Sequence, residues 1–153
     1  MLDSTPTAVA GILHGNLHHF GNFDQCLSIN VEDFNIFGKY CLVKLRYWPT
    51  SKLYPNFYAD NITVYRDPPL SSSIWSMLRV TKDPRFQRRD IIYIGICIPH
   101  SCSPDDLRYS LEKDYLYKFL NKGINVDFSI SKNYCVSQYD RNKETSPGFF
   151  LYV

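Results

Sequence analysis

The sequence predicts an α+β domain in which a small antiparallel sheet packs against one main amphipathic helix and is stapled by disulfides. Three observations predict this fold. Alternating apolar residues indicate strands, a capped segment near residue 103 indicates one long helix, and five cysteines lie within or beside these segments. The chain of 153 residues suits one domain and is long enough to bury a hydrophobic core.

Four segments favour β-structure. Residues 38–48 and 124–136 alternate between apolar and polar side chains, as half-buried strands do, and residues 23–31 alternate less regularly. Residues 90–99 form a continuous, β-branched run, which is typical of a buried central strand. The apolar faces of the two regular strands consist of Cys41, Val43, Leu45 and Tyr47, and of Val126, Phe128 and Ile130.

The main helix is expected over about 103–122. Ser103 is a favourable N-cap, Pro104 suits the first helical position, and Asp106 completes a capping box. Gly123 ends the pattern. Apolar side chains recur at helical spacing and predict the face that packs on the sheet: Leu107, Leu111, Tyr115, Leu116, Phe119 and Leu120.

The charge balance disfavours a nucleic-acid partner. The chain carries 17 basic and 15 acidic residues, a net charge of +2. Nucleic-acid binding domains usually present a basic stripe, whereas the densest basic cluster here is Arg85, Arg88 and Arg89, which reads as a solvated face.

Cys97, His100 and Cys102 lie close together and raise four possibilities: a metal site, a redox pair, a nucleophile with its base, or disulfide bonding. A redox pair would have two residues between its cysteines, and a structural zinc site would need a second pair of ligands. His14, His18 and His19 lack an acidic partner and are interpreted as solvated loop residues. We therefore expect no metal, no cofactor and no catalytic residue, and favour disulfides.

Five cysteines leave one without a partner in the chain, and fifteen frameworks (five odd cysteines times three pairings) remain open. The arrangement we prefer places Cys26 and Cys41 near Cys97 and Cys102 and leaves Cys135 as the odd cysteine. Disulfides fit an oxidising compartment. There, Asn61 of the sequon Asn-Ile-Thr, inside a proline-rich surface excursion, would be a glycosylation site.

The last residues have two interpretations. After a Pro-Gly break, residues 148–153 are apolar and form either a final strand or the first turn of a truncated transmembrane helix. We assign residues 1–147 to the domain.

Three stretches of sequence, which contain four matched blocks, carry a family resemblance. "MLDSTPTAVAGILHGNLHHFGNFDQCLSI", "GKYCLV" and "GICIPHSCSPDDL" resemble, in order and spacing, the N-terminal extracellular domain of the nose-resistant-to-fluoxetine proteins. The matched blocks are Met1–Asp3, Gly11–Ile29, Gly38–Val43 and Gly95–Leu107. The family domain normally begins further upstream, so the resemblance implies that this domain is incomplete at its N-terminus and that the odd cysteine has lost an upstream partner.

The resemblance implies a disulfide-bonded extracellular or lumenal domain that precedes an acyltransferase-3-like membrane region. Family members are associated with uptake of lipids and hydrophobic drugs. We therefore expect a non-enzymatic domain that binds an apolar small molecule or lipid, or presents it to its own membrane domain. The alternative is a protein–protein interaction or structural module that supports that membrane region. Candidate ligand-binding aromatics are Trp48, Tyr54, Phe57, Tyr58 and Trp75.

Overall fold

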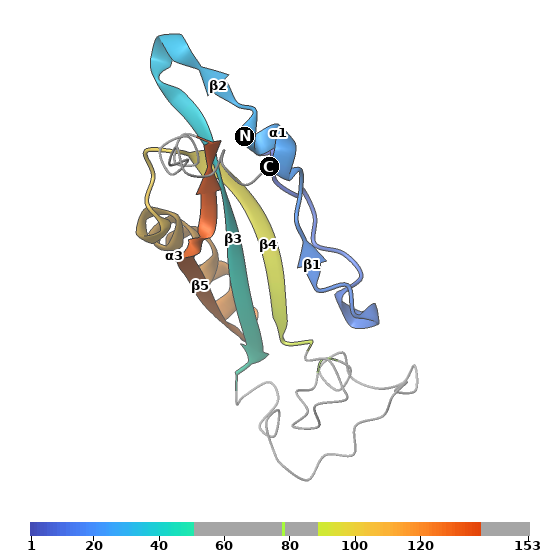
Figure 1. Cartoon of the computed structure of the whole chain (residues 1–153). Helices are drawn as coiled ribbons and strands as arrows, with labels where there is room; N and C mark the ends of the chain where they lie inside the picture. The colour runs from blue at the N-terminus through green and yellow to red at the C-terminus, as the bar shows by residue number, and fades with distance from the viewer. Residues whose placement is uncertain (51–77, 79–88, 139–153) are drawn as a thin grey trace.

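The computed structural model of the chain describes residues 1–50, 78 and 89–138. It confirms the predicted α+β class: a five-stranded sheet carries one long helix and is cross-linked by two disulfides. The long central strand β3 pairs with β4 along one edge and with β5 along the other (Figure 1).

The antiparallel part of the sheet follows from the predicted alternation. β3 (Ile36–Pro49) pairs antiparallel with β4 (Ile91–Pro99) and with β5 (Ile124–Ser137). Val43 and Leu45, on the predicted apolar face of β3, are only 1% and 7% exposed. A period of two therefore predicts correctly which face of β3 is buried.

A short parallel strand was not predicted. β1 (His18–His19) pairs with the outer edge of β4, where the His18 ring stacks on Tyr93 with the ring centroids 5.4 Å apart. His19 is buried, and its Nε2 lies 3.2 Å from the carbonyl oxygen of Asn16. The interpretation as solvated loop residues is therefore wrong for His19, whereas His18 is exposed as expected but belongs to a strand.

The segment 23–31 also differs from its prediction. It forms the short helix α1 (Phe23–Leu27), followed by the two-residue strand β2 (Asn30–Val31), which pairs with the start of β3. The Asn22 side chain accepts a hydrogen bond from the N–H of Gln25 at 3.0 Å. This N-cap favours a helix over a strand, because the apolar–polar alternation of the segment is irregular.

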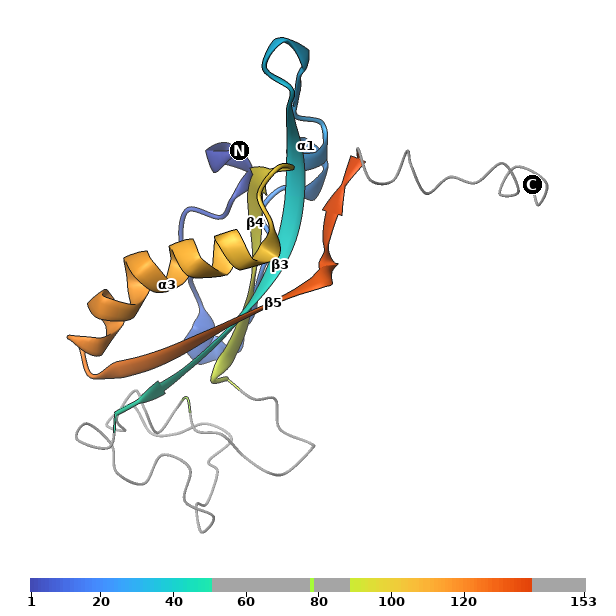
Figure 2. The ribbon, with the colours of Figure 1, turned by 90° about the vertical axis from the view of Figure 1, so that its left-hand side faces the viewer.

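The main helix α3 (Pro104–Leu120) begins at the predicted capping box. The Ser103 hydroxyl accepts a hydrogen bond from the N–H of Asp106 at 3.1 Å, and the Asp106 carboxylate accepts one from the Ser103 N–H at 2.8 Å. Hydrogen bonds from Ser103 hold the pKa of Asp106 below its usual value. α3 then runs alongside β5 (Figure 2).

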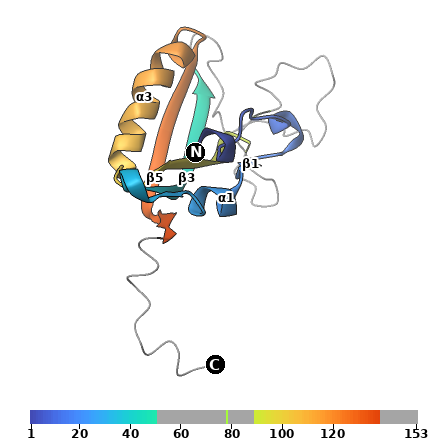
Figure 3. The same cartoon turned by 90° about the horizontal axis from the view of Figure 1, so that it is seen from above.

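The buried core is divided between the two faces of the sheet. On one face, Leu107 of α3 packs with Val43 and Phe128. On the other face, α1 brings Leu27 against Tyr40. Figure 3 shows α3 and α1 on opposite sides of the sheet. The sheet is therefore covered on both faces near one end.

Two disulfides hold that end together. Cys26 of α1 bonds to Cys97 of β4, and Cys41 of β3 bonds to Cys135 of β5. Cys102 is the free cysteine among the described residues. The expected proximity of Cys26 to Cys97 is confirmed, whereas the choice of Cys135 as the odd cysteine is wrong, because β5 returns antiparallel to β3 and places Cys135 opposite Cys41.

Candidate ligand-binding cavity

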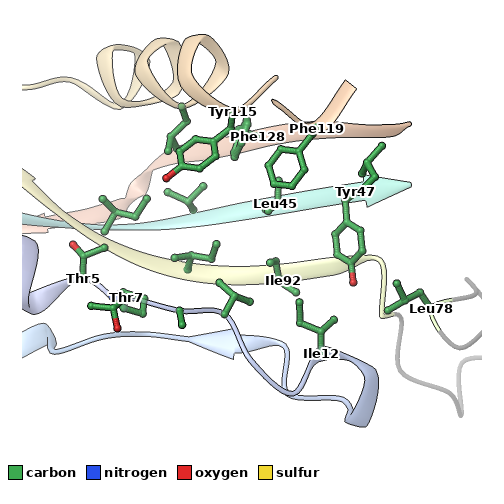
Figure 4. Close-up of a pocket in the computed structure, with 18 residues that line it drawn as sticks. Thr5, Thr7, Ile12, Leu45, Tyr47, Leu78, Ile92, Tyr115, Phe119 and Phe128 are labelled. Atoms are coloured by element: carbon green, nitrogen blue, oxygen red, sulfur yellow. The ribbon is translucent and has the colours of Figure 1, made fainter. Parts of the chain in front are cut away.

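A half-open cavity of about 640 Å³ lies over one face of the sheet, between α3 and the N-terminal segment (Figure 4). Its size falls within the range typical of small-molecule sites, roughly 300–1,000 Å³. The side chains around it come from the N-terminal segment, β3, β4, α3 and β5, together with Leu78. The lining residues are Thr5, Pro6, Thr7, Ala8, Val9, Ile12, Val43, Leu45, Tyr47, Leu78, Ile92, Ile94, Ile96, Leu111, Tyr115, Phe119, Ile124 and Phe128.

The sheet supplies the floor of the cavity. Alternate residues of β3 and β4 point to the same face, so Val43 and Leu45 lie beside Ile94 and Ile92, their cross-strand partners. Phe128 of β5 adds an aromatic ring next to Leu45. Alternate residues of β4 face the cavity, and all three of them are isoleucines: Ile92, Ile94 and Ile96.

Helix α3 supplies one wall. Leu111, Tyr115 and Phe119 follow one another at intervals of four residues and therefore lie on one side of the helix. The rings of Tyr115 and Phe119 stack with their centroids 6.2 Å apart. Tyr115 keeps 45% of its surface exposed, which places it at the edge of the cavity. The stripe predicted to pack on the sheet thus lines an open space beside it.

The N-terminal segment from Thr5 to Val9 supplies the opposite wall and is held at both ends. The Thr5 hydroxyl accepts a hydrogen bond from the backbone N–H of Cys97 at 3.2 Å. Beyond Val9, the side chain of Asn16 donates to the carbonyl oxygen of Ala10 at 3.0 Å. Between these anchors, Pro6 to Val9 form no backbone–backbone hydrogen bond with the described residues.

Few polar side chains line the cavity, and two of them already hydrogen-bond to the backbone. Among the 18 described lining residues, those with a polar side chain are Thr5, Thr7, Tyr47 and Tyr115. The Tyr47 hydroxyl donates to the carbonyl oxygen of Arg89 at 2.6 Å, and the Thr5 hydroxyl donates to that of Met1 at 3.3 Å. Burial, and then the charge of Asp90, raise the pKa of Tyr47 far above its usual value, so this phenol stays neutral.

A family model described as the nose resistant-to-fluoxetine protein, N-terminal domain, matches residues 1–111. The chain belongs to this family. The matched stretch extends from the N-terminal wall of the cavity through β3 and β4 to Leu111, the first residue of α3 that lines it. No curated protein and no solved structure matches the chain significantly.

Membership in the nose resistant-to-fluoxetine family, together with the two disulfides, identifies the chain as an extracellular or lumenal domain of the kind found in membrane proteins. Within the described part, no helix is both long and apolar enough to cross a membrane. Residues 148–153, assigned to a final strand or a truncated transmembrane helix, lie outside the described residues.

Of the aromatics predicted to bind a ligand, the structure describes Trp48, and Trp48 does not line the cavity. Trp48 lies next to the Arg46 guanidinium, which sits 5.4 Å from the centre of its ring. The other predicted site residues lie outside the described residues: Tyr54, Phe57, Tyr58, Trp75 and the sequon residue Asn61. The sequence signal for the α3 wall of the cavity was the four-residue spacing, whereas Thr5 to Val9 have no periodicity that could have revealed them.

The disulfides divide the cysteine–histidine cluster: Cys97 is bonded to Cys26, whereas Cys102 keeps a free thiol. Cys97 is oxidised to a disulfide with Cys26, so it is neither a thiolate ligand nor a nucleophile. His100 places its ring edge-on to Phe37, with the centroids 5.8 Å apart. In the ranges that the structure describes, no three His, Cys, Asp or Glu side chains gather as a metal site would require.

Proposed function

We propose that this domain binds an apolar small molecule or lipid in the cavity between α3, the sheet and the N-terminal segment. The observation that supports it most is the lining itself: 14 of the 18 lining side chains that the structure describes carry no polar atom, and the cavity opens to solvent. Apolar surface left accessible in this way gains free energy when an apolar ligand displaces water from it.

The domain acts, in this proposal, as a non-catalytic carrier. It captures the ligand outside the membrane and presents it to the membrane domain of a longer protein. Family membership supports the extracellular placement, and the half-open form of the cavity supports exchange of a ligand without unfolding. Lipid transport by the whole protein is the context in which such a carrier would work.

The proposal is tested by titrating the full chain with 1-aminoanthracene, a neutral fluorescent probe, excited at a wavelength that tryptophan does not absorb. We expect saturable binding with a dissociation constant of about 10 μM or tighter, because a site of this size buries most of a three-ring molecule. Ile94→Trp fills the floor of the cavity, and Ala8→Trp fills it from the N-terminal wall. Both should weaken binding about tenfold or more.

Lys44→Trp is the matched control, because Lys44 is exposed and lies next to Leu45 on the opposite face of β3. It should bind the probe as the unmodified chain does, and circular dichroism checks that all three variants fold. Absence of saturable binding would overturn the carrier function and favour the alternative, a structural module that supports the membrane region. Equal loss of probe affinity in all three variants, the control included, would show that the loss does not come from filling the cavity, and would contradict binding there.

A further inference from the structure

Among the residues that the structure describes, the cavity lining contains no side chain that is charged at neutral pH and could balance the charge of a ligand. None of its 18 residues is Asp, Glu, Lys, Arg or His. An ionised group moved from water into apolar surroundings without a partner loses far more solvation than it regains. Whatever the cavity holds must therefore keep any charge outside it.

In the part of the chain that the structure describes, the charged side chains next to the cavity are not among its lining residues. Lys118 of α3 is exposed and places its ammonium group over the Tyr115 ring, 5.4 Å from the ring centre. Asp90, beside the Tyr47 end, is fully buried, and its carboxylate lies 3.6 Å from the Arg46 guanidinium. The described lining residues at the Tyr47 end therefore offer an anionic ligand no cation.

Two of the four hydroxyl groups of the described lining already make hydrogen bonds within the protein. Those of Thr5 and Tyr47 already donate to backbone carbonyl oxygens. Thr7 and Tyr115, which come from the two opposite walls, are the other lining residues with a hydroxyl group. Hydroxyls can satisfy a neutral polar group such as an alcohol or ester, but they do not neutralise a carboxylate or an ammonium ion.

We infer that the cavity selects neutral lipophilic molecules, such as long-chain alcohols, esters and hydrocarbons, over ionised fatty acids or amines of the same chain length. This inference rests on the proposed function, because it names the class of ligand that the same cavity takes. The selectivity comes from the desolvation of the charged head group, since the apolar chains of the competing ligands are the same.

The test displaces 1-aminoanthracene from the unmodified chain at pH 7.4 with decan-1-ol, methyl decanoate, decanoate and decylammonium. We expect the alcohol and the ester to compete about tenfold or more effectively than either ion. Equal competition by decanoate or decylammonium would overturn the inference and leave the carrier function intact. Failure of the probe itself to bind would overturn the carrier function, so the two failures are distinguishable.

A matched pair of variants tests the physical cause. Tyr115→Arg places a cation at the edge of the cavity, whereas Tyr117→Arg places it on the same helix at a residue that is 72% exposed and does not line the cavity. The first variant should improve competition by decanoate about tenfold relative to decan-1-ol, and the second should leave the ratio unchanged. An equal change in both would assign the selectivity to the general charge of the protein. The measurement on the unmodified chain stands whether or not these variants fold.

Discussion

The two ends of the sheet are built in different ways. At one end, Gly38 to Cys41 of β3 lie between α1 and the start of α3, and both disulfides cross this region. The Lys39 ammonium also donates to the carbonyl oxygen of Cys102 at 2.9 Å. Toward the other end, from Val43 to Tyr47, the same strand forms the floor of the cavity. We call these the stapled end and the cavity end.

The difference shows how a small domain can tolerate an incompletely filled core. Unfilled space costs stability because the lining atoms lose packing contacts. Disulfides that span 71 and 94 residues offset such a loss by restricting the unfolded chain, and they do so without requiring contacts at the cavity itself. Stability concentrated at one end therefore allows the other end to contain a cavity.

The largest effect should follow removal of a staple. The double variant Cys41→Ala with Cys135→Ala is expected to lower the free energy of unfolding by about 2–5 kcal/mol, measured by denaturant titration followed by circular dichroism. Cys102→Ala, which removes the free thiol, is the control and should change it by less than about 1 kcal/mol. Similar losses in both would remove the distinction between the two ends.

A pair of enlargements compares the packing of the two ends directly. A Cβ at Gly38 would collide with the carbonyl oxygen of Cys26, which the disulfide holds in place, so Gly38→Ala should cost about 1–3 kcal/mol. Ile94→Phe extends into the cavity and should cost less than about 1 kcal/mol while lowering probe affinity. If Ile94→Phe is as destabilising as Gly38→Ala in thermal unfolding, the cavity end is as tightly packed as the stapled end.

Loss of the helix cap is expected to have a moderate effect at the stapled end. Ser103→Ala removes the hydroxyl that caps α3 and should cost about 1 kcal/mol in denaturant unfolding. Because the folded pKa of Asp106 is lowered, its stabilising effect is present above the unfolded value of about 3.8 and is lost as the pH falls through the folded value. Ser103→Ala should therefore show a weaker decline in stability below pH 4 than the unmodified chain. An unchanged acid profile would contradict this assignment.

The smallest effect is expected at the cavity end, from Tyr47. Tyr47→Phe removes the hydrogen bond to Arg89, which is half-buried, and should cost about 0.5 kcal/mol at neutral pH. The folded pKa of Tyr47 is raised, so its contribution is complete below the unfolded value of about 10 and declines as the pH rises above it. The variant should lose less stability than the unmodified chain between pH 10 and 11, as measured by thermal unfolding. A steeper alkaline loss in the variant would contradict the assignment.

Local patterns in the sequence predict much of this fold. The alternation in β3 and the capping box at Ser103 identify the central strand and the start of α3, because each depends on neighbouring residues alone. The α1 segment is mispredicted, since a single side-chain cap at Asn22 outweighs a weak alternation. Short-range patterns therefore succeed where one local signal dominates.

The disulfide partners and the cavity depend on distances that no local pattern contains. Cys41 meets Cys135 because the register of β5 against β3 places them opposite each other, although they are 94 residues apart in the sequence. The spacing of Leu111, Tyr115 and Phe119 predicts which side of α3 faces the sheet, but not how close the helix lies to it. That separation decides whether an apolar stripe becomes solid core or the wall of a cavity.

Cys97 connects the two ends of the molecule through a single residue. Its sulfur bonds to Cys26, while its backbone N–H donates to the Thr5 hydroxyl at the start of the N-terminal wall. We expect the wall to be complete only after this cysteine has been oxidised, because α1 and the first residues of the chain are otherwise free to leave the sheet. In the carrier function proposed above, the chain would then acquire the capacity to retain a ligand only once it is in an oxidising compartment.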